Sequence, residues 1–127
     1  MIRVRASARA VHFELDADGA RTLLGHVLHL RQHGHCEFTA RDALEGGSIA
    51  ISLARSDSDR LALRKKALDF LLDDDSIGLA EFKLAEFIAQ GCCATPEFIE
   101  CAPQTSQKPG RKVRTISTYF VAAPTQN

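Results

Sequence analysis

The chain has 127 residues, of which 45% are hydrophobic and 25% charged, and this composition predicts one globular domain and argues against disorder. Sixteen basic residues balance sixteen acidic ones, so overall charge cannot drive nucleic-acid binding, which would need a local basic patch. No apolar run approaches the ~18 residues of a membrane span. We therefore expect a cytoplasmic protein with reduced cysteines and no membrane partner.

The first half of the chain carries one strand pattern and one helix pattern. Alternating apolar residues predict a strand over residues 10–15, and we expect residues 1–9 and 124–127 to fray. Leucines and Val27 at helical spacing predict a helix from Ala20 that Gly34 ends in a left-handed conformation. A short strand after Cys36, a turn around Gly46 and a strand from Ser48 to Ala54 should follow.

In the second half we expect a helix over 57–73, because leucines recur there and the serines and aspartates at 56–59 offer caps. The run Asp73 to Ser76 should end it, and another helix should cover 77–90. A basic hairpin over 97–121 should close the domain. The resulting fold class is α+β: a single compact domain without internal repeats, with a mainly antiparallel sheet, about three helices and the order β-α-β-β-α-α-β-β.

Four of the five histidines lie between His26 and His35, and three of these share one stripe of the first predicted helix. His29 and His33, spaced i,i+4, could supply two zinc ligands, with His35 and Cys36 as further candidates. No HExxH motif or paired CxxC completes the set. One alternative is that the histidines only form the polar border of the buried helix face, where protonated imidazoles near the last carbonyls are stabilised by the helix dipole. Another is that they form a pH-sensitive or partner-binding surface.

The second hypothesis is a winged-helix-like DNA- or RNA-binding regulator, built from helices 57–73 and 77–90 and the basic hairpin 97–121. The helix that should enter the major groove has little with which to contact base edges. Phosphate contacts alone would need only a basic patch. Its candidate residues are Lys108, Arg111, Lys112, Arg114, Arg60, Arg64 and Lys65.

Catalysis is not indicated, since no motif pairs a nucleophile with a base, and we expect no enzyme and no catalytic residues. Cys92, Cys93 and Cys101 lack such a partner, and the aspartate run at 73–75 lacks the pattern of a calcium loop. The leading hypothesis is a small bacterial or phage binding protein that acts on a partner protein as an inhibitor, immunity-like protein or adaptor. It implies no cofactor unless the histidines hold zinc, and it is compatible with a homodimer.

Overall fold

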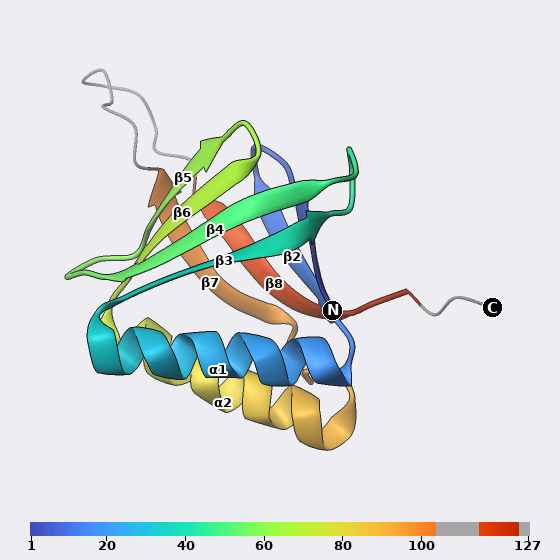
Figure 1. Ribbon diagram of the computed structural model, residues 1–127. Helices are drawn as coiled ribbons and strands as arrows, with labels where there is room; N and C mark the ends of the chain where they lie inside the picture. The colour runs from blue at the N-terminus through green and yellow to red at the C-terminus, as the bar shows by residue number, and fades with distance from the viewer. Residues whose placement is uncertain (104–114, 125–127) are drawn as a thin grey trace.

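The computed structural model describes residues 1–103 and 115–124, which form a single small domain. Eight strands close into a barrel, and two helices lie side by side across one of its ends (Figure 1). The strands follow one another around the barrel in the order β1-β2-β8-β7-β5-β6-β4-β3. The elements along the chain are β1 (Ile2–Ala6), β2 (Ala10–Leu15), α1 (Ala17–His33), β3 (His35–Asp42), β4 (Ser48–Arg55), β5 (Arg60–Arg64), β6 (Ala67–Leu72), α2 (Asp74–Gln90), β7 (Glu97–Pro103) and β8 (Ile116–Ala122).

The barrel consists of two halves with the same topology, each running strand, strand, helix, strand, strand. Each half forms two antiparallel hairpins, β1–β2 with β3–β4 and β5–β6 with β7–β8. The hairpins are joined by parallel pairings: β1–β3 and β5–β7 within the halves, and β2–β8 and β4–β6 between them. Exchanging the halves leaves every pairing unchanged. The expectation that the chain lacks an internal repeat is therefore wrong.

The two helices begin and end by the same device. Asp16 caps α1 by accepting the Gly19 amide at 2.6 Å, and Asp73 caps α2 by accepting the Ser76 amide at 2.8 Å. Each helix has 17 residues and ends at a left-handed glycine, with φ of 79° at Gly34 and 80° at Gly91. The predicted end of the first helix at Gly34 is confirmed. The aspartate run at 73–75 begins a helix instead of ending one.

The helix expected over 57–73 is wrong, because this segment forms the hairpin of β5 and β6. Its leucines fit a helical spacing, but burial alternates along β6, where Leu68, Phe70 and Leu72 point into the barrel. A period of two therefore describes the segment better than a period of 3.6. No helix–turn–helix unit exists over residues 57–90, and the winged-helix arrangement is lost with it.

Three further expectations fail. The described residues contain two helices instead of about three, and parallel and antiparallel pairings alternate around the barrel, so the sheet is not mainly antiparallel. Residues 1–9 contain β1, whose Val4 is buried, where we expected fraying. The α+β class stands. Two segments lie outside the described residues. They are residues 104–114, which belong to the hairpin expected over 97–121, and residues 125–127 of the tail.

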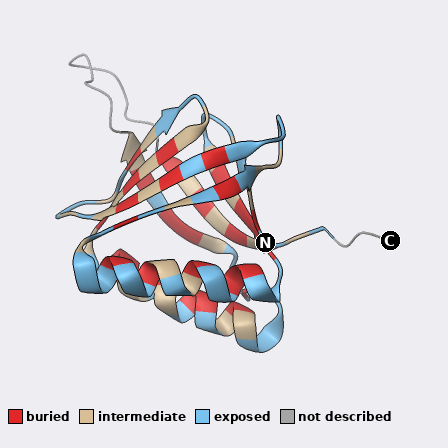
Figure 2. Ribbon diagram, in the orientation of Figure 1, coloured by how far each residue is buried: buried red, intermediate tan, exposed pale blue. Residues whose placement is uncertain are grey.

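The core fills the barrel and the space between the barrel and the helices. Phe13 and Phe70 occupy equivalent places in the two halves and contact each other, with ring centroids 5.9 Å apart. Figure 2 shows the buried sides of both helices facing the barrel and the exposed sides facing away from it. The space left beside these rings is about 20 Å³, little more than one water occupies. This part of the barrel is a packed core and has no room for an internal ligand.

We predict that Phe70→Ala lowers the free energy of unfolding by about 3–5 kcal/mol, because it leaves a cavity at the centre of the barrel. Urea denaturation followed by circular dichroism measures the change. Phe82→Ala is the matched control, since Phe82 is 68% exposed and its loss should change stability by about 0.5 kcal/mol or less. Similar values for the two variants would contradict this packing.

Candidate functional site

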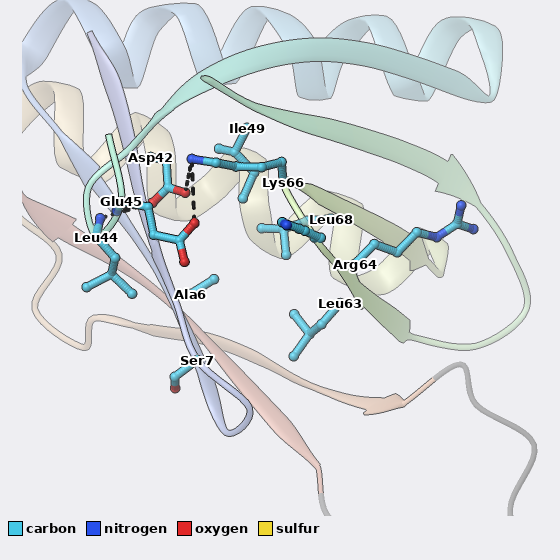
Figure 3. A pocket seen from close by; sticks show the side chains of 11 residues that line it. Ala6, Ser7, Asp42, Leu44, Glu45, Ile49, Leu63, Arg64, Lys66 and Leu68 are labelled. Carbon is cyan, nitrogen blue, oxygen red and sulfur yellow. Dashed lines mark hydrogen bonds and ion pairs between the residues drawn. The ribbon is translucent and has the colours of Figure 1, made fainter. Parts of the chain in front are cut away.

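The end of the barrel opposite the helices holds a pocket of about 200 Å³ (Figure 3). Ala6 from the end of β1, Asp42 from the end of β3, Leu44 from the β3–β4 turn and Leu63 from β5 line it. Its floor is apolar, because Ile49 and Leu68 lie there with 5% and 1% exposure. Arg64, Lys65 and Lys66 bring three positive charges to the same pocket, and Asp42 and Glu45 bring two negative ones.

The side chain of Lys66 connects the β5–β6 turn to the β3–β4 turn. Its ammonium group donates to Asp42 Oδ2 at 2.8 Å and to the Gly46 carbonyl at 2.6 Å, and Glu45 lies 3.9 Å away. Its φ is 59°, and it is the only described non-glycine residue with a positive φ. A side chain in this conformation costs about 1 kcal/mol or more, and such residues are frequent at functional sites. Lys66 adopts this conformation in the tight turn between Arg64 and Ala67, which pair across the β5–β6 hairpin.

Asp42 is the acceptor of this cluster. Besides Lys66, its Oδ1 accepts the backbone amides of Leu44 and Glu45 at 3.0 and 3.2 Å. The hydrogen bond from Lys66, followed by those from the two amides, lowers the pKa of Asp42 to about 2. The ionised carboxylate therefore contributes to stability above its ordinary pKa of 3.8, and this contribution is lost as the pH falls toward 2.

We predict that Lys66→Met raises the pKa of Asp42 from about 2 part of the way toward 3.8, because the amides of Leu44 and Glu45 remain in place. Methionine keeps the length of the side chain and the cost of the positive φ, so the change isolates the loss of the ammonium group. Titration of the carboxyl carbon by NMR measures the pKa. An unchanged value in the variant would show that Lys66 does not hold Asp42.

The structure separates the histidines that the sequence places together. His26 stacks on Phe38 with ring centroids 4.2 Å apart, and its Nδ1 lies 3.7 Å from the Cys36 sulfur. Burial, and secondarily the neighbouring His29, lower the pKa of His26. The rings of His29 and His33 are 4.3 Å apart, whereas His35 contacts Glu37 and Ser52 on the barrel. Within the described ranges no three potential ligands converge, so the zinc hypothesis has no third ligand there.

The predicted basic patch is also divided. Arg60 lies at the helix end of β5, where its Nε donates to the Ser58 hydroxyl, and Arg64 and Lys65 lie at the opposite end, beside the pocket. Arg64 is paired with Asp69 at 2.9 Å. The remaining candidates, Lys108, Arg111, Lys112 and Arg114, lie outside the described residues. The described candidates therefore do not form the continuous surface that a nucleic acid would need.

The helix end of the molecule is acidic and carries exposed apolar side chains. On α2, Leu79 is 37% and Phe82 is 68% exposed, one helical turn apart. Leu28 on α1 is 45% exposed. Several carboxylates lie on α2, and two of them are held by ion pairs: Asp74 with Arg55, and Glu81 with Arg31. Asp16 is paired with the amino terminus and Asp18 with Arg21. The other carboxylates at this end are Asp57, Asp59, Asp73, Asp75 and Glu86.

Comparison with family models, curated proteins and solved structures gives no match. The site must therefore be interpreted from its own chemistry. Neither helix of the described chain is long and apolar enough to span a membrane.

The four cysteines are free, and they differ in access. Cys36, Cys93 and Cys101 are buried and Cys92 is exposed. Burial raises the pKa of Cys101 to about 12, with a smaller contribution from Asp59, and burial also raises the pKa values of Cys36 and Cys93. Because the thiolate is the nucleophile, the three buried thiols are poorly suited to catalysis at neutral pH.

We predict that one thiol per chain, that of Cys92, reacts quickly with Ellman's reagent in the folded protein at neutral pH. The other three should react only when the protein unfolds, because they are buried and protonated. Cys92→Ser should remove the fast phase and leave the stability unchanged. A second fast thiol in the wild-type protein would contradict this assignment.

The sequence alone does not single out the residues that define the pocket around Lys66 and the exposed side of α2. Lys66 and Asp42 are far apart in the chain, and nothing in the sequence signals that they meet. For Phe82 a signal exists: it lies outside the face formed by Ala80, Leu84 and Phe87, and a phenylalanine there has no place in the core.

Proposed function

We propose that this protein is a non-enzymatic binding protein whose helical layer docks a partner protein through Phe82. The observation that carries the proposal is the exposed pair of Leu79 and Phe82 on α2. Large aromatic side chains dominate the energetics of protein interfaces, where they fill apolar pockets of the partner. An inhibitor, an immunity-like protein or an adaptor would each need such an anchor.

Because the two halves share one topology, the exposed side of α2 can be compared with the equivalent positions of α1. The offset that relates Asp16 to Asp73 also relates Gly25 on α1 to Phe82 on α2. A Cβ atom added at Gly25 would meet nothing within 4 Å, so neither helix needs an apolar side chain at this position. The fold therefore does not require Phe82, which supports a role in binding.

Charge defines the chemistry of the partner. Asp75, Leu79, Phe82 and Glu86 lie on one stripe of α2, at spacings of four, three and four residues. The apolar pair is thus flanked along the helix by carboxylates. The partner that fits is a protein with an apolar pocket rimmed by lysine and arginine. Two α2 faces of identical chains would instead oppose carboxylate to carboxylate, which disfavours self-association through this stripe.

We predict that Phe82→Ala weakens the complex by about 30-fold or more, equal to about 2 kcal/mol, because it removes the central anchor. The tagged wild-type protein would first isolate the partner from its native source, and calorimetry with the purified partner would then measure the affinity. Asp75→Asn should weaken the complex by a smaller factor and reduce its dependence on salt.

Leu28→Ala is the matched control, since Leu28 is a similarly exposed apolar residue on α1. A partner that binds wild-type, Leu28→Ala and Phe82→Ala proteins equally would contradict the proposal. Sedimentation that shows the protein binding only to other copies of itself would also contradict the proposal.

A further inference from the structure

We propose that the pocket at the turn end of the barrel binds an aliphatic carboxylate, either a free branched acid or the carboxyl-terminal residue of a polypeptide. The inference concerns a surface opposite the helical layer and does not depend on the docking of a partner through Phe82. Three independent features of the pocket lead to it: its size, its exposed leucines and its charges.

The size of the pocket limits the ligand. Its volume of about 200 Å³ is smaller than the ~300–1,000 Å³ of sites for drug-sized molecules. One branched aliphatic side chain and the group attached to it would occupy this space. A complete nucleotide, a sugar chain or a folded helix is larger than this volume.

The walls of the pocket favour an apolar group. Leu44 is 55% and Leu63 is 37% exposed, and Figure 3 shows both at the edge of the same hollow as Ala6. Apart from Met1, the other large exposed apolar residues of the described chain lie on the helices. An aliphatic group between Leu44 and Leu63 would remove apolar surface from water on both sides, at roughly 25 cal/mol per Å².

The charges favour an anion at the entrance. Asp42 and Lys66 form an ion pair at 2.8 Å, and Arg64 is paired with Asp69, so these charges largely offset one another. Glu45 lies 3.9 Å from the Lys66 ammonium group and is largely exposed, so a ligand carboxylate could take its place. Lys65, the neighbouring residue in the turn, is exposed and adds a positive charge at the rim.

The positive φ of Lys66 fits this role. The β5–β6 turn could accept glycine at this position without backbone cost, yet a lysine stands there and is held by Asp42 and Gly46. The strained residue thereby fixes an ammonium group beside an apolar pocket. This arrangement is the one that an aliphatic carboxylate requires: a cation at the mouth and leucines within.

Titration of the ¹⁵N-labelled full chain with N-acetyl-leucine tests the proposal. We expect saturable shifts of the amides of Ala6, Leu44, Leu63 and Lys66, with an affinity in the millimolar range for so small a ligand. N-acetyl-leucinamide, which lacks the charge, should bind at least about threefold more weakly. Isopentylamine, which carries the opposite charge, should not bind. No shifts with N-acetyl-leucine, or tighter binding of the amide or the amine, would overturn the proposal.

Variants separate the contributions of charge and apolar contact. Lys65→Ala and Leu63→Ala should each weaken binding by about threefold or more. Glu45→Gln should strengthen binding, because it removes the competing carboxylate, and weaker binding in this variant would contradict the assignment of charges. Phe82→Ala should leave the affinity unchanged, so failure at this pocket is distinguishable from failure of the helical docking surface.

Two further probes distinguish the source of the ligand. The free acid 4-methylpentanoate and a pentapeptide ending in leucine share the aliphatic carboxylate and differ in what precedes it. Tighter binding of the peptide identifies a polypeptide terminus as the ligand, and tighter binding of the free acid identifies a small metabolite. Binding of neither would overturn the proposal.

Discussion

The structure depends on the closure of the sheet by two parallel strand pairings, β2 with β8 and β4 with β6. Each half of the chain ends in strand edges whose backbone amides and carbonyls need partners, and the other half supplies them. A single half would leave its sheet edges and the apolar side of its helix exposed. The two halves therefore form one core, and the barrel has no open edge.

Closure also determines where recognition can occur. The interior is filled by side chains such as Phe13 and Phe70, and the helices cover one end of the barrel. No helix of the described residues covers the opposite end, and the turns that meet there form the pocket around Lys66. Among the described residues, the outer side of the helices and the mouth of the barrel both carry exposed apolar side chains. They carry opposite features, acidic with an exposed phenylalanine at one end, and basic with a shallow apolar pocket at the other.

The sequence predicted well those elements whose local signals are unambiguous. The first helix was found because apolar residues at helical spacing end at Gly34, and the strand at 48–54 because Ile49, Ile51 and Leu53 alternate. The segment 57–73 was misassigned because leucines at 61, 68, 71 and 72 satisfy both periods, and only pairing with β4 and β7 decides between them. The pocket could not be predicted, since Asp42 and Lys66 meet only through the register of β3, β4 and β6.

The repeat distinguishes residues that the fold requires from residues that it does not. At four pairs of equivalent buried positions both halves carry apolar side chains: Phe13 and Phe70, Leu15 and Leu72, Val27 and Leu84, Leu30 and Phe87. At positions outside the core the halves differ: Thr22 corresponds to Leu79, Gly25 to Phe82 and His29 to Glu86. Packing constrains the first set because every interior volume must be filled. Glu86 accepts the backbone amide of Ala94 within the chain, whereas neither Leu79 nor Phe82 is buried by the fold. The difference between the halves at these two apolar positions is therefore what supports the proposal that α2 docks a partner.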